Sequence, residues 1–102
     1  MGKIDFQEVY EFLTKIPKGK VVTYGMIGEY LGDKRLARAV GNILHKNPDG
    51  EKYPCYKVVS QAGKLSKNYA FGGIEKQKEL LIKDNVEVNK YKVDLSIYKW
   101  NP

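Results

Sequence analysis

The chain has 102 residues, and its 18 Lys and Arg against 12 Asp and Glu give a formal net charge of +6 and a pI near 9.3. Its one cysteine excludes an internal disulfide, and one cysteine with one histidine excludes a structural zinc site. The basic charge favours an acidic partner such as a phosphate backbone, although many small proteins are this basic for solubility alone.

The sequence contains no segment typical of a membrane or secreted protein. No apolar run approaches the ~20 residues that span a bilayer, and the first residues lack the continuous apolar segment of a signal peptide. We therefore expect one domain over residues 1–102, without a membrane partner, in the cytoplasm or, if the source is eukaryotic, the nucleus.

The first predicted helix covers residues 5–16. Apolar side chains recur there at helical spacing, and Asp5 and Glu8 are placed as a capping box. The pattern stops before Pro17 and Gly19, which end a helix. We expect a core helix whose buried face consists of Phe6, Val9, Phe12, Leu13 and Ile16.

Two further helices follow with the spacing of a helix-turn-helix. Residues 20–24 form a brief extended segment, after which Thr23 can cap a short helix over residues 24–31 that ends at Gly32. A third helix is predicted from Lys34 to His45. The link between them is a tight turn containing glycine, as in a helix-turn-helix.

The third helix has two chemically distinct faces. Apolar side chains at i, i+4, i+7 and i+8 form a stripe that must face the core. The opposite face is cationic and small in its middle, which allows close approach to a surface and contact with phosphates or a groove; an ordinary solvated face is the alternative. The apolar stripe consists of Leu36, Val40, Ile43 and Leu44, and the opposite face of Lys34, Arg35, Arg38, Gly41, Asn42 and His45.

The single cysteine lies between a turn and a predicted strand. Asn47 before Pro48 favours a chain reversal, and the chain then returns through Pro54 and Cys55 into an apolar strand over residues 57–59. On the residues alone, a free cysteine in such a place is ordinarily a small buried apolar side chain.

The C-terminal part is predicted as a helix and a hairpin. After a turn at residues 60–64 and a loop at 66–73, a last helix covers residues 74–84 and ends at Asp84 and Asn85, since asparagine tolerates left-handed geometry. The tail over residues 86–102 begins with an alternating pattern, which predicts a small hairpin with Asn89 and Lys90 as its two-residue turn.

Five segments resemble one protein family in their order and near spacing: "IPKGKVVTYGMIGEYLG", "RLARAVGNILHKNP", "PCYKVV", "NYAFGG" and "KELLIKDNV". The family is that of the alkylguanine-DNA alkyltransferases, also called methylated-DNA–protein-cysteine methyltransferases, in their DNA-binding, active-site domain. The resemblance covers residues 5 to 88. With the predicted elements, it implies a mainly α, α/β fold: a single small domain with a winged-helix-like helix-turn-helix and a short β hairpin.

The resemblance gives the cysteine a chemical role. In this family a cysteine irreversibly accepts an alkyl group from O6 of a damaged guanine that has been rotated out of the duplex, without cofactor or metal. Cys55 matches that acceptor, and Asn47 matches an asparagine that ties the DNA-reading helix to the active-site turn. The implied partner is double-stranded DNA containing alkylated guanine, bound by a monomer.

Further residues are implied to hold the base. Tyr24 matches a tyrosine whose hydroxyl bonds the guanine, and the carbonyls of Cys55 and Val58 match acceptors for its amino group. Tyr69 and the Ala70 N–H match a loop that closes over the base. A core tyrosine with a surface hydroxyl is the structural alternative for Tyr24.

The resemblance also assigns the cationic face of the third helix to DNA. Arg38 matches an arginine that enters the minor groove and fills the gap left by the flipped base. The small residues Ala37, Ala39 and Gly41 match positions that let the helix lie against the groove. We expect their neighbours Lys34, Arg35 and Asn42 to contact the DNA as well.

The sequence departs from the family at the proton-transfer residues. Tyr56 replaces a histidine that takes the thiol proton through water, and Asp84 replaces a glutamate that orients the histidine. A neutral tyrosine, with a pKa of about 10, is a poor base. Relay from Asp84 through Tyr56, or stabilisation of the thiolate by Lys57, are the rescues we consider. Loss of base catalysis costs about 10²-fold in rate, which slows the chemistry without abolishing it.

Two more departures bear on function. The loop between Val59 and Tyr69 is one residue longer than the family pattern, and the amino-terminal domain of most family enzymes is absent from this chain. Such shortness resembles the alkyltransferase-like proteins, which bind alkylguanine without removing the alkyl group and usually lack the cysteine. We expect alkyl transfer to Cys55 in a single-turnover methyltransferase, with a non-catalytic lesion sensor as the main alternative and a general duplex-binding transcription factor as a third.

Overall fold

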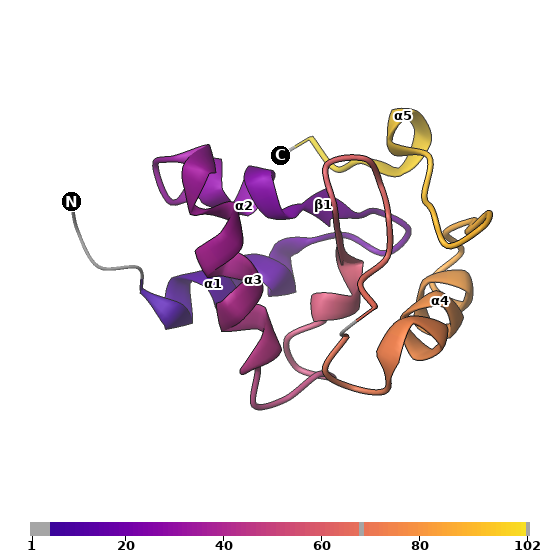
Figure 1. Ribbon diagram of the computed structural model, residues 1–102, viewed down its shortest axis with the longest axis horizontal. Coiled ribbons are helices and arrows are strands. Elements are labelled where there is room, and N and C mark those ends of the chain that lie inside the picture. Colours follow the sequence, from indigo (N-terminus) through magenta and orange to yellow (C-terminus); the bar gives the residue numbers. More distant parts are fainter. Residues whose placement is uncertain (1–4, 68, 102) are drawn as a thin grey trace.

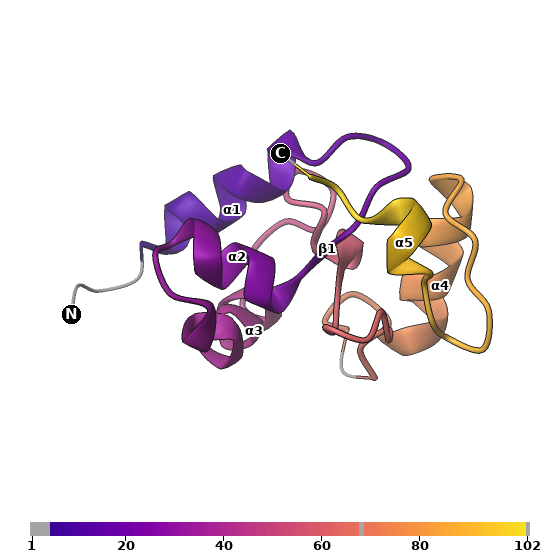
Figure 2. The ribbon, with the colours of Figure 1, turned by 90° about the horizontal axis from the view of Figure 1, so that it is seen from above.

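The computed structural model describes residues 5–67 and 69–101. Figure 1 shows helices α1 to α3 on one side and α4 and α5 on the other, with β1 between them. Figure 2 shows the same division from above. In chain order the elements are α1 (Phe6–Lys15), β1 (Val22–Thr23), α2 (Tyr24–Tyr30), the 3₁₀ turn η1 (Lys34–Leu36), α3 (Ala37–His45), the 3₁₀ turn η2 (Cys55–Lys57), β2 (Val58–Val59), α4 (Gly73–Lys83) and α5 (Leu95–Tyr98).

Helix α1 confirms the first predicted helix and its cap at Asp5, but within the described residues Glu8 does not complete the predicted capping box. The Asp5 carboxylate accepts a hydrogen bond from Gln7 N at 2.9 Å, which satisfies one of the free N–H groups at the helix start. Four of the five predicted core residues are buried, but Phe6 is 49% exposed. The prediction for Phe6 is wrong because the first turn of α1 lies at the edge of the molecule (Figure 2).

The helix-turn-helix is confirmed as well. Thr23 caps α2 by accepting a hydrogen bond from Met26 N at 3.1 Å. The chain then folds back so tightly that a Cβ on Gly28 would lie 2.9 Å from Asp33 O. The predicted third helix begins as η1, where the Asp33 carboxylate accepts from Arg35 N, and continues as α3. Glycine at position 28 is therefore a requirement of the turn.

A parallel pair of short strands separates two hydrophobic cores. Val22 pairs with Val58 and Thr23 with Val59. Because neighbouring strand residues point to opposite faces, Val58 belongs to the first core and Val59 to the second. The first core contains residues of α1, α2, α3 and η2, and the second consists of Val21, Val59, Leu65, Leu81, Val86 and Val93.

The C-terminal part differs from prediction in its turn. Helix α4 ends as expected, with Asn85 at φ 65°. The hairpin turn, however, is Lys90–Tyr91 and not Asn89–Lys90, because Asn89 and Lys92 exchange backbone hydrogen bonds of 2.9 and 3.1 Å around it. The segment at residues 63–65 sets this register by pairing with residues 91–93, a long-range contact that local turn preferences do not encode.

The tail also contains a short helix that the sequence pattern did not predict. Asp94 caps α5, and the following residues run beside β1, where Trp100 N donates to Val21 O at 2.8 Å. Within the described part of the chain, no helix has the length and apolar character needed to cross a membrane. The mainly α, α/β fold class predicted from the sequence is confirmed.

Candidate active site

Cys55 lies at the start of η2, where a buried asparagine fixes the preceding turn. The cysteine is 6% exposed. Asn47 Nδ2 donates to Tyr53 O at 2.8 Å, and Asn47 Oδ1 accepts from Asp49 N at 3.0 Å. Since Asn47 follows α3 directly, these bonds join the end of that helix to the turn that carries the thiol. The predicted connection between Asn47 and the active-site turn is present.

The thiol borders a small pocket between α3, the loop before α4, and α4 itself. The cavity volume is about 40 Å³, close to the ~30 Å³ that one water molecule occupies in the liquid. A purine therefore enters only if part of the lining moves. The lining residues are Tyr24, Gly41, Leu44, His45, Cys55, Ser66, Tyr69, Ala70 and Gln77.

Burial keeps the thiol and the two tyrosines of the pocket in their neutral forms. Burial raises the pKa of the Cys55 thiol, and hydrogen bonds with Asn47 and Tyr69 oppose that effect only in part. Burial, followed by the nearby sulfur, raises the pKa of Tyr69 far above its ordinary value. Burial likewise raises the pKa of Tyr24, whose hydroxyl is hydrogen-bonded with Ser66. At neutral pH the site thus holds a protonated thiol among neutral hydroxyls.

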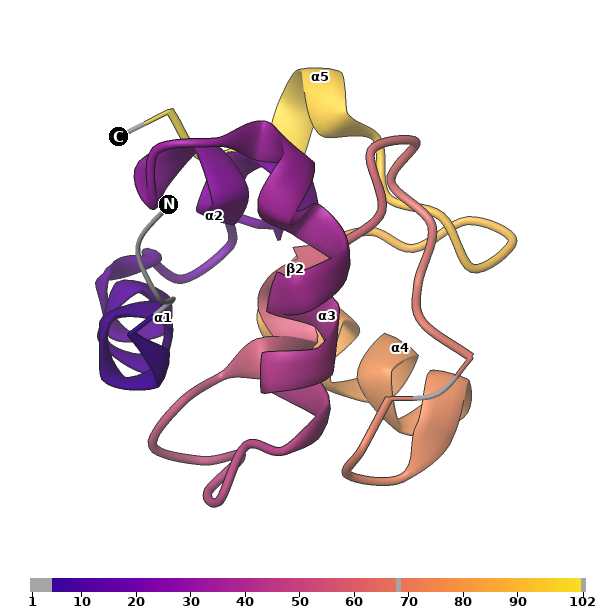
Figure 3. The same ribbon diagram turned by 60° about the vertical axis from the view of Figure 1, so that its left-hand side comes forward.

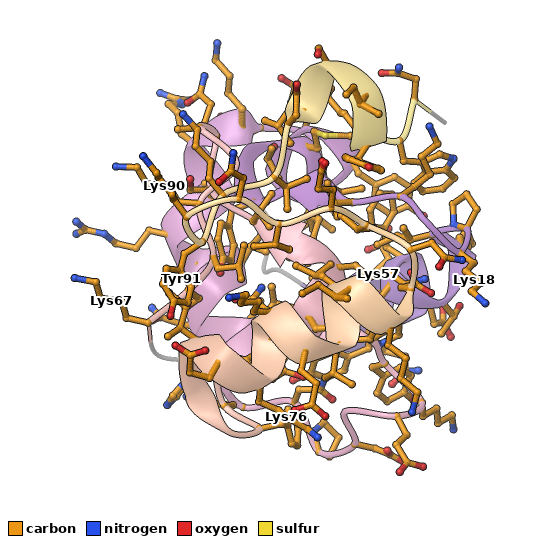
Figure 4. All side chains as sticks on the ribbon, turned by 90° about the vertical axis from the view of Figure 1, so that its right-hand side faces the viewer. Lys18, Lys57, Lys67, Lys76, Lys90 and Tyr91 are labelled. Carbon is orange, nitrogen blue, oxygen red and sulfur yellow. The ribbon has the colours of Figure 1, made fainter. Side chains whose placement is uncertain are left out.

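The groups expected to activate the thiol lie outside this pocket. Lys57 Nζ is buried 3.7 Å from Asp84 Oδ2 and donates to Ile16 O at 3.1 Å. Asp84 Oδ2 also accepts from Gly19 N at 3.0 Å. Figure 4 shows Lys57 inside the molecule beside α4. The structure therefore does not bring Lys57 or Asp84 to the sulfur.

Tyr56 lines a second groove, beside the active-site turn. That groove lies between residues 48–54 and α4, and Tyr69 and Phe71 also line it. Burial and the charge of Asp84 raise the pKa of Tyr56. Because a higher pKa makes a tyrosine harder to deprotonate, the direction of this shift does not favour the relay from Asp84 through Tyr56 that we considered from the sequence.

Sequence reasoning missed a buried glutamine that holds the site together. Gln77 is 1% exposed; its Nε2 donates to Tyr56 O at 3.0 Å and Val58 O at 3.1 Å, and its Oε1 accepts from Ser66 N at 2.7 Å. The sequence does contain a signal for this residue, because Gln77 is a polar residue one turn before Leu81 on the buried face of the predicted helix. The Val58 carbonyl, expected to accept from a guanine, retains one lone pair.

Helix α3 presents its predicted face at the surface (Figure 3). Lys34, Arg38 and Asn42 are exposed. Arg35 is exposed too, but its guanidinium binds the Asp33 carboxylate at 2.8 to 3.0 Å, which neutralises its charge. The small residues of this face, Ala37, Ala39 and Gly41, are half-buried.

The structure has room for a side chain at Gly41. A Cβ built on it would meet the Tyr24 ring at 3.9 Å, an ordinary contact distance. Packing within the chain therefore does not require glycine here. Because Gly41 lies both on the exposed face of α3 and in the pocket lining, its smallness leaves space at the mouth of the pocket.

The chain matches the family model described as the 6-O-methylguanine DNA methyltransferase, DNA binding domain, over residues 5–86. It belongs to this family. The resemblance found in the sequence is thereby confirmed. Among the described residues of this family member, no group of three or more His, Cys, Asp or Glu side chains could hold a metal ion.

Relatives of this methyltransferase-family chain include both enzymes and base-flipping proteins. The bifunctional methyltransferase/endonuclease of Picrophilus torridus is 41% identical over 99% of the chain, which spans only 34% of that protein. The DNA base-flipping protein of Vibrio parahaemolyticus is 36% identical over 93% of the chain and 94% of its own length. The crystal structure of S. pombe Atl1 in complex with damaged DNA containing O6-carboxymethylguanine has a TM-score of 0.86 at 33% identity, covering 95% of this chain and 94% of that one.

Proposed function

We propose that this chain binds duplex DNA through α3, rotates an O6-alkylated guanine into the pocket beside Cys55, and accepts the alkyl group on the sulfur. The observation that carries the proposal is the pocket itself, which places a lone thiol beside Tyr24 and beside Gly41 on the exposed face of α3. As in the sequence-based prediction, the protein acts as a monomer and needs no cofactor. It works in the compartment that holds the DNA, the cytoplasm or the nucleus.

Recognition of DNA begins at the exposed face of α3. Arg38 is exposed and has no ion-pair partner among the described residues, so its guanidinium is available to occupy the gap that a flipped base leaves. Ala37, Ala39 and Gly41 let the backbone of α3 approach the groove. Arg35 contributes less, since Asp33 already neutralises it.

Entry of the base requires Tyr69 to move. The cavity of about 40 Å³ is too small for a purine, and Tyr69 lines it together with Cys55. A base that displaces this ring gains access to the sulfur and to the Val58 carbonyl. Gln77 keeps that carbonyl in place from the other side through its bond of 3.1 Å.

The chemical step is a displacement at the alkyl carbon. The sulfur of Cys55 forms a bond to that carbon, the bond between the carbon and O6 breaks, and the thiol proton ends on the guanine. Because burial raises the pKa of the thiol, only a small thiolate fraction is present at neutral pH. We expect slow transfer, which suffices for a reaction that each molecule performs once.

A duplex oligonucleotide containing O6-methylguanine tests this function. After incubation, intact mass measurement should show the gain of one methyl group, and Cys55→Ala should abolish the gain. Tight lesion binding without a change in mass would reject alkyl transfer. Equal binding to damaged and undamaged duplexes would reject lesion recognition altogether and leave a general duplex binder.

A non-catalytic lesion sensor is the second candidate. Two observations favour it: the pKa of the Cys55 thiol is raised, and Lys57 and Asp84 pair with each other instead of facing the sulfur. Such a sensor would use the same pocket and the same face of α3. The mass measurement separates the two functions because only transfer alters the protein.

A further inference from the structure

The C-terminal hairpin and the segment at residues 63–65 form one small unit, which we call the basic wing. Lys64 and Lys92 are bridged as an antiparallel pair. Leu65 N donates to Tyr91 O at 3.0 Å, and Val93 N donates to Gly63 O at 2.8 Å. The wing presents the exposed lysines Lys64, Lys90 and Lys92, and we include with it the exposed Lys67, two residues beyond Leu65 in the chain.

The wing is held firmly against α4. The Tyr91 hydroxyl donates a hydrogen bond to Glu75, and Lys78 Nζ lies 5.1 Å from the centre of the Tyr91 ring. At the other side of the wing, Gly63 has a φ of 85°, and a Cβ there would overlap Val93 O. The lysines at the tip therefore extend from an anchored base and not from a free tail.

The tip of the wing has an unusual sequence for its backbone. Lys90 and Tyr91 have φ values of 54° and 60°, a region in which two-residue hairpin turns strongly favour Asn-Gly or Asp-Gly. Tyr91 is accounted for by its contacts with α4. Lys90 forms no hydrogen bond, ion pair or ring contact through its side chain within the described residues, and that side chain is exposed.

The lysines of the wing carry charge that the protein does not neutralise. The ion pairs in the described part of the chain join Asp33 to Arg35, Lys57 to Asp84 and Lys76 to Glu79, so none involves the wing. Lys92 acts electrostatically on Asp94, whose pKa is lowered mainly by its bonds with Ser96. Lys64, Lys67 and Lys90 thus have no ion-pair partner in the described part of the chain, and Figure 4 places two of them, Lys67 and Lys90.

These two lysines point to the side of the molecule that carries the proposed DNA surface. Figure 4 shows Lys67 and Lys90 projecting on the side where α2 and α3 lie, whereas Lys18 projects on the opposite side. The pocket lies between α3 and the loop that includes Ser66 and Tyr69. A duplex lying on α3 across the mouth of this pocket would therefore extend toward the wing.

We propose that the basic wing is a second DNA contact, in which Lys67 and Lys90 bind backbone phosphates beyond the flipped base, on the side of the pocket away from α3. This inference rests on the proposed function for the position of the duplex. Phosphate contacts hold a protein in register on the duplex but do not read its sequence. The wing accordingly supplies affinity and orientation, and the pocket supplies discrimination between damaged and normal guanine.

Salt-dependent binding of the variants Lys67→Gln and Lys90→Gln tests the wing. The longest dimension of the protein, 38 Å, matches about 11 base pairs at 3.4 Å each, so a duplex of about 20 base pairs with a central O6-methylguanine covers the whole face. Each lost phosphate contact should lower the slope of log affinity against log salt by about 0.9. Both variants should weaken binding to damaged and undamaged duplexes by the same factor.

Lys18→Gln is the matched control, since it removes the same charge from an exposed lysine on the opposite side. Its salt slope should equal that of the original chain. If Lys67→Gln and Lys90→Gln also leave the slope unchanged, the wing is not a DNA contact, while a lesion preference in the original chain would still uphold the proposed function. If the salt slopes of Lys67→Gln and Lys90→Gln fall but the original chain binds damaged and undamaged duplexes equally, the wing is a DNA contact and the proposed function is wrong.

Discussion

The Lys57 ammonium lies 3.7 Å from Asp84 Oδ2, and both side chains are about nine-tenths buried, at 8% and 11% exposed. The pair joins the active-site turn to the end of α4. Each partner makes a further bond, Lys57 to the carbonyl of Ile16 and Asp84 to the N–H of Gly19. The carboxylate at the position of the family glutamate therefore holds a lysine in place instead of orienting a base for Cys55.

Removing one charge of this pair should destabilise the fold. In Asp84→Asn the buried ammonium of Lys57 loses its counterion, and an uncompensated buried charge costs roughly 3 kcal/mol. Urea denaturation should show that loss in the free energy of unfolding. The control is Glu79→Gln, which breaks the exposed pair with Lys76 at 3.3 Å and should change stability by less than about 0.5 kcal/mol. If both substitutions changed the free energy of unfolding equally, the buried Lys57–Asp84 pair would contribute no more to stability than an exposed pair.

Restoring the family histidine should give only a partial gain. Tyr56→His supplies a side chain that can accept a proton near neutral pH, but Asp84 stays engaged with Lys57 and Gly19. The rate of methyl transfer, followed by intact mass at timed intervals, should rise by less than the about 10²-fold that a well-oriented general base provides. A rise of that full size would mean that the histidine needs no orientation by Asp84.

The helices could be predicted from the sequence because the residues that start and end a helix act on neighbouring backbone groups. The cap at Asp5, the cap at Thr23 and the left-handed end at Asn85 are each encoded within one turn of chain, and all three are present. Phe6 and the Lys90–Tyr91 turn were mispredicted because exposure and register depend on distant segments. Helix α5 was not predicted for the same reason, because it depends on how the tail packs against the rest of the chain.

The site was predicted in outline but not in its electrostatics. Cys55, Tyr24, Tyr69 and Ala70 were expected around one flipped base, and they line one pocket; Gly41, expected only against the DNA groove, lines it as well. The direction of the Lys57 side chain could not be read from its position next to Tyr56, because a long flexible chain can reach either side of the turn. Its burial beside Asp84 is a tertiary contact between residues far apart in sequence.

The reactivity of the thiol should depend steeply on pH. Since burial raises the pKa of Cys55, modification by iodoacetamide at neutral pH should be slower than in the urea-unfolded chain, and the folded rate should still be rising above the ordinary thiol pKa of about 8.5. Mass spectrometry against pH measures both curves. By linkage, the thiol of the unfolded chain ionises at a lower pH than the thiol of the folded chain. The stabilisation that comes from keeping Cys55 protonated is therefore complete below the ordinary thiol pKa, and it is lost as the pH rises through the pKa of the folded state. Cys55→Ser should reduce this alkaline loss; identical folded and unfolded curves would show an unperturbed thiol.

Two arginines on the same surface should contribute unequally to DNA binding. Arg38 is exposed and free of ion pairs in the described part of the chain, whereas Arg35 is bound to Asp33 at 2.8 Å. Arg38→Ala should weaken binding to a duplex with O6-methylguanine at least tenfold, without a change in the thermal unfolding midpoint. Arg35→Ala should weaken it much less. Fluorescence anisotropy measures both affinities, and unfolding of the Arg38 variant would instead assign that residue a structural role.

Gly41 and Gly28 should respond in opposite ways to the same added methyl group. In Gly41→Ala the Cβ would lie 3.9 Å from Tyr24, so no clash occurs, and alanine within a helix is favoured over glycine by about 0.5–1 kcal/mol. The variant should therefore be more stable, yet bind the lesion several-fold more weakly because the methyl group occupies the mouth of the pocket. Gly28→Ala should be destabilised, since its Cβ would lie 2.9 Å from the backbone at Asp33 O. Urea denaturation and anisotropy on the same two samples separate stability from binding; unchanged lesion affinity in Gly41→Ala would show that α3 does not approach the DNA at this point.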